Sequence, residues 1–212
     1  MIKAVIFDLD GTLTNTIEDI ADAANYALSK QNLPLRSLEV YRSIVGNGIV
    51  DLLTRASNGV KGEAFDRLKS DFFSVYGSDK TVAYDGMREL VGELKSRGYK
   101  VAVVTNKEHN SAVEVVKRFY GDSFDIIRGN VEGVPVKPDP TLTLAVMKEL
   151  GVKAEECIFI GDSGVDILTG KNSGAVPVGE TWGYRKKEEL IECGARYIID
   201  KPEELLSVIE KL

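Results

Sequence analysis

Short apolar runs that alternate with amphipathic segments dominate this chain of 212 residues. Within the runs, apolar residues follow one another instead of alternating with polar ones, which is typical of parallel strands covered on both faces. Strands that alternate with helices predict right-handed βαβ units and a doubly wound α/β sheet. The expected strands are Ile2–Phe7, Lys100–Val104, Phe124–Arg128, Cys157–Ile160, Ala175–Val178 and Tyr197–Ile199. The expected helices between them are Asp85–Arg97, Ser111–Phe119, Asp139–Leu150 and Val165–Asn172.

The segment of residues 15–80 breaks this alternation, because it contains amphipathic helical patterns and no clear strand. In its first part, apolar residues recur at the spacing of a helix with one buried face. The expected helices are Ile17–Gln31, Leu38–Val45, Ile49–Ala56 and Glu63–Tyr76. We therefore expect residues 15–80 to form a helical domain inserted after the first strand. Residues 1–14 and 81–212 are expected to form the domain that contains the sheet.

Composition argues against several classes of protein. The net charge of −6 and the pI near 5.0 argue against a nucleic-acid surface. The densest basic run is Arg185–Lys187, and we expect it to be the solvated start of a helix. No apolar stretch approaches the roughly 20 residues that span a bilayer, and the N-terminus lacks the features of a secretory signal. Two cysteines without a CxxC spacing fit a reducing compartment. We therefore expect a cytoplasmic protein with neither nucleic acid nor membrane as partner.

The single histidine, His109, argues against a His-rich metal site, and we expect it at the exposed start of a helix. Any chemistry is therefore left mainly to carboxylates, lysine and hydroxyl groups. Ligands of open α/β sheets bind beyond the carboxyl ends of the strands. The polar residues that follow the expected strands, directly or after a loop, are Asp8 and Asp10, Thr105 and Asn106, Lys137, and Asp162 with Asp166.

These residue types suit a divalent cation and a phosphoryl group at one edge of the sheet. Asp8, Asp162 and the backbone carbonyl of Asp10 can supply oxygen ligands for Mg²⁺. Thr105 and Asn106 would donate hydrogen bonds to phosphoryl oxygens, and Lys137 would offset their charge. Each feature also has a structural interpretation: a turn, a helix cap, a solvated loop lysine, or acids at a helix start. Four such coincidences in this order favour the functional interpretation.

Four segments carry a resemblance to a known family: DLDGTLTNT (Asp8–Thr16), VVTNK (Val103–Lys107), VKPDP (Val136–Pro140) and IGDSGVDI (Ile160–Ile167). In this order they resemble the motifs of the haloacid dehalogenase superfamily, which implies a Rossmann-like core with a helical cap at residues 15–80. The resemblance implies that Asp8 is the nucleophile and Asp10 the general acid and base, with Lys137 and Thr105 stabilising transferred charge. It also implies a metal site of Asp8, Asp10 and Asp162, with Asp166 either a ligand or a neighbour of the ligands.

The resemblance extends to substrate binding. Gly11, Thr105, Asn106 and Lys137 are expected to contact the phosphoryl group. The stretch from Gly46 to Gly48 resembles the cap loop of phosphoglycolate phosphatases, so that Gly46 and Asn47 are expected at the substrate, although a plain helix–helix turn explains the glycines equally well.

The expected function is Mg²⁺-dependent hydrolysis of a small phosphomonoester, similar to phosphoglycolate, through an aspartyl-phosphate. The expected partner is this small phosphorylated substrate, and the expected assembly a monomer or homodimer. A β-phosphoglucomutase-like mutase or an inorganic pyrophosphatase shares the motifs, although Thr12 favours a phosphatase over a mutase. A receiver-like signalling module would lack the helical insertion and an acid at the position of Asp10. A non-catalytic module would be expected to have lost Asp8 or Lys137.

Overall fold

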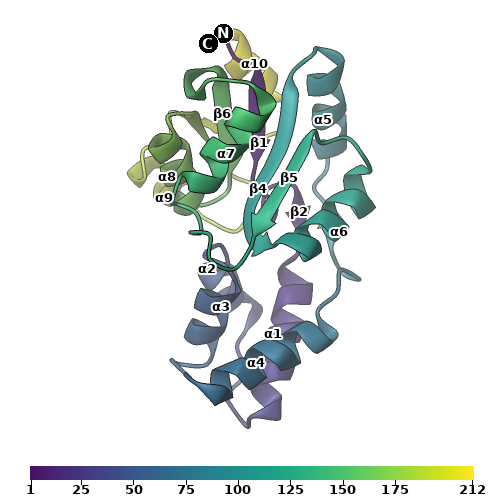
Figure 1. The fold of residues 1–212 in the computed structure, drawn as a ribbon, viewed down its shortest axis with the longest axis vertical. Helices are drawn as coiled ribbons and strands as arrows, with labels where there is room; N and C mark the ends of the chain where they lie inside the picture. The colour runs from purple at the N-terminus through teal and green to yellow at the C-terminus, as the bar shows by residue number, and fades with distance from the viewer.

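A single six-stranded sheet forms the centre of the larger of two lobes in the computed structural model, which describes all 212 residues (Figure 1). All pairings in this sheet are parallel, in the order β5-β4-β1-β6-β7-β8. The strands are β1 (Ala4–Phe7), β4 (Lys100–Glu108), β5 (Ile126–Asn130), β6 (Cys157–Gly161), β7 (Val176–Glu180) and β8 (Tyr197–Ile199). The prediction of a parallel α/β sheet is confirmed.

The first strand lies in the middle of the sheet, between β4 and β6. Phe7 is level with Val103 on one side and with Ile160 on the other. The residues that follow these three positions therefore leave the sheet at the same edge, which is the edge where ligands of such sheets bind. The register explains why Asp8 and the end of β6 lie side by side.

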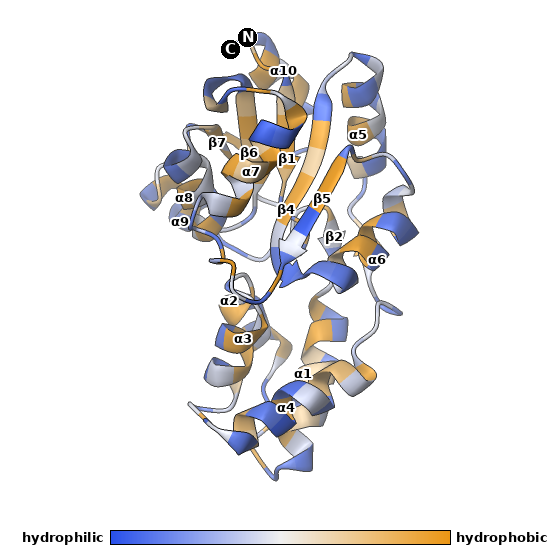
Figure 2. Cartoon of the chain, viewed as in Figure 1, coloured by the Kyte–Doolittle hydropathy of each residue, from blue (hydrophilic) through white to orange (hydrophobic).

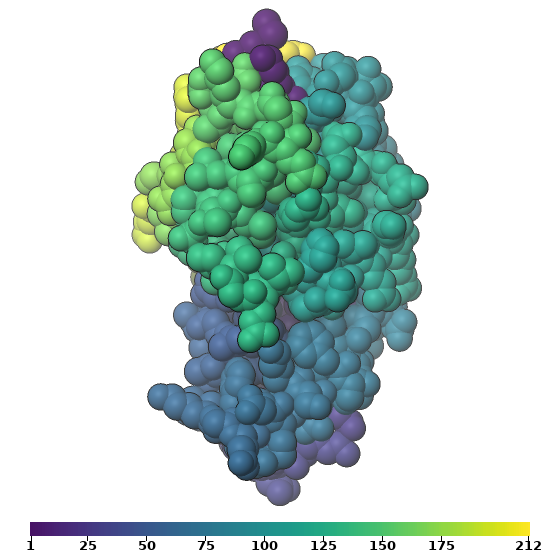
Figure 3. Space-filling view, in the orientation of Figure 1, coloured from purple at the N-terminus to yellow at the C-terminus, as the bar shows by residue number.

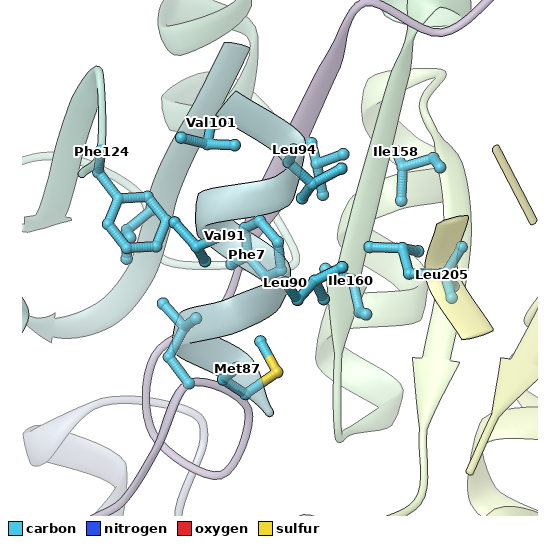
Figure 4. Close-up of a cluster of buried hydrophobic side chains, with 14 of the residues drawn as sticks. Phe7, Met87, Leu90, Val91, Leu94, Val101, Phe124, Ile158, Ile160 and Leu205 are labelled. Atoms are coloured by element: carbon cyan, nitrogen blue, oxygen red, sulfur yellow. The ribbon is translucent and has the colours of Figure 1, made fainter. Parts of the chain in front are cut away.

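Both faces of the sheet are covered, which explains the continuous apolar runs (Figure 2). Val5 and Phe7 join the larger cluster with α5 (Met87–Ser96), α6 (His109–Tyr120) and α10 (Glu204–Glu210), part of which is shown in Figure 4. Ala4 and Ile6 face the opposite side, where α7 (Thr141–Leu150) and α8 (Gly164–Ser173) pack. Successive side chains of β1 thus point to two different apolar layers.

The second lobe consists of four helices, α1 (Ile17–Lys30), α2 (Leu38–Ile44), α3 (Ile49–Ala56) and α4 (Glu63–Val75). They share an apolar cluster of 14 buried residues, separate from the clusters on the sheet. In the space-filling view this lobe, which we call the cap, lies beyond the carboxyl edge of the sheet (Figure 3). An antiparallel pair of short strands, β2 (Thr14–Asn15) and β3 (Val82–Ala83), connects the lobes. The domain boundaries after residues 14 and 80 stay a proposal.

Several local features differ from the sequence expectations. β4 continues four residues past Val104, because Thr105, Asn106 and Lys107 are buried rather than part of a solvated turn. The short strands β2 and β3 were missed, since two residues are too few to form a recognisable pattern. The helix α10 was also missed. The helix α9 (Lys187–Glu192) does begin in the basic run, but Arg185 lies just before it and is half-buried rather than fully solvated, with its side chain 15% exposed.

His109 begins α6 as expected but is half-buried, and its Nδ1 accepts a hydrogen bond from Gly129 N at 3.2 Å. No helix in the structure has the length and apolar character that crossing a membrane requires.

Candidate active site

Asp8 lies at the carboxyl end of β1 and is buried beside other charged side chains. Its N–H donates to Ile160 O at 3.0 Å, which keeps β1 and β6 level. Lys137 Nζ lies 2.8 Å from Asp8 Oδ1 and 2.7 Å from Asp166 Oδ1. Burial lowers the pKa of Lys137, but the carboxylates of Asp166 and Asp8 outweigh this effect and raise the pKa above its ordinary value. One ammonium group therefore serves two carboxylates.

Asp162 places a third carboxylate directly after β6. Its Oδ2 accepts a hydrogen bond from Tyr184 N at 2.7 Å, and it takes part in no salt bridge. Carboxylate oxygens of Asp8, Asp162 and Asp166 lie within 4.8 Å of one another. Burial raises the pKa of Asp162 well above its ordinary range and that of Asp8 to about 6. Burial and the neighbouring carboxylates thus disfavour the charged forms of Asp8 and Asp162.

The same group fits a hard divalent cation. Asp8 Oδ1 is buried, and its one charged partner is the ammonium group of Lys137 at 2.8 Å. Mg²⁺ takes oxygen ligands and commonly uses one or two carboxylates together with water and phosphate. Both oxygens of Asp166 already accept hydrogen bonds, from Lys137 and from Ser163. Asp8 and Asp162 are therefore better placed than Asp166 to hold a cation.

A glycine lets the backbone approach these carboxylates closely. Gly11 has a φ of +97°, and a Cβ at this position would lie 2.6 Å from Asp162 Oδ2. Any other residue there would be strained and would displace the carboxylate. The structure places Gly11 against Asp162, and its contact with substrate stays a prediction.

Asp10 points toward a lysine that the sequence analysis gave no role. Lys107 Nζ lies 3.1 Å from Asp10 Oδ1, and Thr16 Oγ1 donates to the same oxygen at 2.8 Å. The ammonium group of Lys107 also donates to the hydroxyl of Tyr76, which follows α4 in the cap. Burial lowers the pKa of Lys107, but Asp10 and Tyr76 outweigh it and raise the pKa. Asp10 is thus held by the core and, through Lys107, linked to the cap.

Asn106 is not free to bind a phosphoryl group through its side chain. Its Nδ2 donates to Gly46 O at 2.8 Å and to Lys137 O at 3.1 Å, and its Oδ1 accepts from Lys137 N at 2.7 Å. Both amide hydrogens are therefore engaged. The expected contact between this side chain and substrate is replaced by contacts that hold the cap loop and the backbone of Lys137. Thr105 is buried beside it, and its Oγ1 accepts only from Lys107 N, at 3.3 Å.

A cavity that opens to solvent lies between the carboxyl edge of the sheet and the cap. Asp8, Asp10 and the stretch from Thr105 to Glu108 line the core side. The cap side is mostly apolar: Ile20, Val45, Ile49, Leu52, Phe72 and Phe73, with Gly46, Gly48 and Tyr76. Asn47 is not part of this lining, and its Nδ2 donates to Asp51 Oδ2 at 3.2 Å. Of the cap loop, the glycines face the cavity and the asparagine side chain holds α3.

Sequence reasoning gave no role to Lys107, to Tyr76 or to Glu180 at the end of β7. Glu180 is fully buried at the end of β7, and its Oε2 accepts from Trp182 N at 2.7 Å and from Gly183 N at 3.1 Å. Burial raises the pKa of Glu180 well above its ordinary range. By fixing this turn, Glu180 places Tyr184 N at Asp162. An acid at the end of a strand was the available signal.

Comparison with known proteins agrees with this geometry. The haloacid dehalogenase-like hydrolase family matches residues 2–174. A phosphoglycolate phosphatase of Vibrio parahaemolyticus serotype O3:K6 is 32% identical, over 98% of this chain and 96% of the relative. A phosphoglycolate phosphatase of Haemophilus influenzae is 31% identical, with 98% of each chain covered.

Solved structures lead to the same family. A predicted phosphoglycolate phosphatase from Haemophilus somnus 129PT superposes with a TM-score of 0.91 at 29% identity, covering 98% of this chain and 97% of the other. A hydrolase from Pseudomonas syringae superposes with a TM-score of 0.83 at 29% identity, covering 99% of both chains. The expectations of an enzyme and of this fold are confirmed: the chain belongs to the haloacid dehalogenase-like hydrolases.

Proposed function

We propose that this hydrolase is a Mg²⁺-dependent phosphatase that hydrolyses a small phosphomonoester through an aspartyl-phosphate on Asp8. The observation that carries the proposal is the position of Asp8. Its carboxylate lines the cavity and also belongs to the three-carboxylate group with Asp162 and Asp166. A nucleophile at this point can meet the substrate on one side while a cation is held on the other.

The first step is attack of an Asp8 carboxylate oxygen on phosphorus. The bond between phosphorus and the leaving oxygen breaks, and Asp10 donates a proton to that oxygen. In the second step Asp10 takes a proton from water, which attacks the phosphorus of the aspartyl-phosphate. The bond between phosphorus and the Asp8 oxygen then breaks, and inorganic phosphate is released with Asp8 restored.

The surrounding residues position these groups and offset charge, which are the main contributions to phosphoryl transfer. Lys137 lies beside Asp8 and offsets negative charge on the phosphoryl group, while Thr105 Oγ1 can donate to it. Asp8 and Asp162 would hold Mg²⁺, which supplies further positive charge at the transferred group. Lys107 and Thr16 hold the carboxylate of Asp10 toward the cavity.

Phosphoglycolate is the first candidate substrate, because it is the compound named for relatives that match nearly the whole chain. The glycines of the cap loop line the cavity, in keeping with a small substrate near Gly46. A cytoplasmic location and a monomeric or homodimeric state stay predictions from the sequence.

The test is phosphate release from phosphoglycolate, pyrophosphate, a sugar phosphate and a nucleotide, each with Mg²⁺ and with EDTA. We expect metal-dependent release with phosphoglycolate as the best substrate. Asp8→Asn should lose all activity, whereas Asp122→Asn, a matched change at an exposed acid, should keep the wild-type activity. Acid quenching during turnover should give a phosphoryl group on the peptide that contains Asp8. Release that persists in folded Asp8→Asn would contradict the mechanism, and a preference for another compound would replace the substrate.

A further inference from the structure

Two core side chains hold adjacent carbonyl groups of the cap. Asn106 Nδ2, at the end of β4, donates to Gly46 O at 2.8 Å. The guanidinium group of Arg185, beyond the end of β7, donates to Val45 O at 2.8 Å and to Arg42 O at 2.6 Å. These residues come from different strand ends of the core and meet the cap at one short segment. We call Asn106 and Arg185 the clamp.

The carbonyls that Arg185 holds are groups that a helix leaves without partners. The helix α2 ends at Ile44, and Val45 is its C-cap residue. The last carbonyls of a helix need partners outside it, and a cationic side chain also interacts favourably with that end. Arg185 is suited to this role because its planar fork can reach two carbonyls at once. Its own position is fixed by the neighbouring helix, where Glu189 Oε1 lies 3.7 Å from Nε.

The held segment forms part of the cavity wall. The two residues whose adjacent carbonyls are held, Val45 and Gly46, line the cavity. So do Gly48 and Ile49, which follow them closely in the chain. A Cβ on Gly48 would lie 3.3 Å from Asn106 O, so the loop packs against the core without room to spare. Losing the clamp would therefore move the wall that faces the reacting group.

Each half of the clamp is joined to a different part of the catalytic centre. Asn106 exchanges two hydrogen bonds with the backbone of Lys137, the residue whose ammonium group pairs with Asp8. Arg185 directly follows Tyr184, whose N–H donates to Asp162 Oδ2 at 2.7 Å. Asn106 and the pair Tyr184–Arg185 thus each contact the cap or adjoin a residue that does, and each also helps to place Lys137 or Asp162.

We infer that Asn106 and Arg185 are positioning residues that lock the cap over the cavity and couple its docking to the placement of Lys137 and Asp162. This inference rests on the proposed function where turnover is concerned, but the docking itself does not. Asn106 acts through the cap loop and Lys137, and Arg185 acts through the end of α2. Neither side chain needs to touch the substrate.

The first experiment is hydrogen–deuterium exchange of the intact protein, compared among wild type, Arg185→Ala, Arg185→Lys and Asn106→Asp. Asn106→Asp keeps an acceptor for Lys137 N but turns the donor to Gly46 O into an anion. We expect exchange over residues 40–52 to become about tenfold faster in Arg185→Ala and Asn106→Asp, as for loss of a charged hydrogen bond, and less so in Arg185→Lys. The matched control is Arg97→Ala, an exposed arginine that pairs with Glu93 on α5.

The second measurement is steady-state turnover at saturating Mg²⁺. We expect kcat/KM to fall about tenfold in Arg185→Ala, because the closed state that reacts is less populated, and to stay at the wild-type value in Arg97→Ala. The double variant of Arg185→Ala and Asn106→Asp should lose less than the product of the two single effects, since both hold one loop.

Unchanged exchange over residues 40–52 in both folded clamp variants would overturn the inference. Exchange that rises equally in the sheet and the cap would also overturn it, because that pattern marks a general loss of stability. If the wild type releases no phosphate from any substrate, the proposed function fails, whereas the exchange data still decide whether the clamp exists.

Discussion

The sheet-containing core and the cap bury different kinds of side chains. Every buried charged residue of the chain belongs to the core: Asp8, Lys107, Lys137, Asp162, Asp166 and Glu180. Within residues 15–80 the buried polar residues are only Thr16, Ser57 and Ser78, and none is charged. Buried charges are costly unless they are paired, so a protein keeps them where chemistry needs them. The buried charged groups are therefore concentrated in one lobe.

The cap contributes the opposite half of the cavity with apolar side chains and backbone groups. Phe72, Leu52 and Ile49 line the cavity from the cap side. Polar contacts between the lobes include the hydroxyl of Tyr76 and the carbonyls of Val45 and Gly46. Such a wall can exclude water and shape the space for a substrate while leaving the charged groups of the core in place.

The largest expected effect comes from removing the cation that two core carboxylates share. Lys137→Met should lower kcat/KM about 1,000-fold, equivalent to about 4 kcal/mol, because Asp8 and Asp166 lose their only ion-pair partner and the phosphoryl group loses a cation. Steady-state phosphate release measures this loss. The exposed Lys117→Met on α6 serves as the control. A Lys137→Met variant that keeps more than a tenth of the activity would show that the charge of the core is not what carries the reaction.

A leucine deletion in each lobe tests whether the two apolar cores are separate. Leu53 in the cap and Leu94 in the core are both fully buried, and each truncation to alanine should cost about 3 kcal/mol. Because the clusters are distinct, we expect Leu53→Ala to lower hydrogen-exchange protection mainly in α1–α4. Leu94→Ala should lower it mainly around the sheet. Equal losses in both lobes from either variant would mean that the protein unfolds as one unit and that the comparison fails.

Binding of Mg²⁺ should stabilise the core increasingly as pH rises. Burial raises the pKa of Asp8 from 3.8 to about 6 in the folded protein. The carboxyl group therefore binds its proton more tightly in the folded protein than in the unfolded chain. Its contribution to stability is therefore present below about pH 4 and is lost as pH rises through about 6. Mg²⁺ binds the ionised carboxylate of Asp8, so its binding free energy offsets this loss of stability as pH rises.

The measurement is the free energy of unfolding at pH 5 and pH 8, with Mg²⁺ and with EDTA. At a Mg²⁺ concentration 100 times its Kd, the expected gain at pH 8 is about 2.7 kcal/mol, with a smaller gain at pH 5. Asp8→Asn should reduce the gain at both values. Equal stabilisation at pH 5 and pH 8 in the wild type would argue against a cation held by Asp8.

The smallest expected effect is at Tyr76, a polar side chain of the cap that contacts Lys107. Tyr76→Phe removes the hydroxyl that accepts from Lys107 but keeps the ring in place. We expect kcat/KM to fall about fivefold, equivalent to about 1 kcal/mol, since Asp10 still holds Lys107. Phosphate release compared with Tyr26→Phe, a half-exposed tyrosine on α1, measures it. A loss as large as that of Lys137→Met would place the cap among the reacting parts.

Much of the fold could be predicted because it depends on local patterns. The strands β1 and β6 were recognised from continuous apolar runs, and the helices α1 and α3 from apolar residues at helical spacing. The extension of β4 to Glu108 and the pair of β2 with β3 could not be predicted, since polar residues or only two residues form them. Arg185 was expected in solvent because three basic residues in a row normally are, yet it is half-buried and its guanidinium group donates to carbonyls at the end of α2.

By itself the sequence determined which residue types stand at the strand ends, and so placed Asp8, Lys137, Asp162 and Asp166 at one edge of a parallel sheet. Only the tertiary structure decided which side chains meet between distant segments. Lys107 contacts Asp10 and Tyr76, and Asn106 contacts Gly46 and Lys137. The physical reason is that the position of a strand follows from the local apolar pattern, whereas a side-chain contact depends on distances between segments far apart in the chain. Those distances exist only once the cap has packed against the sheet.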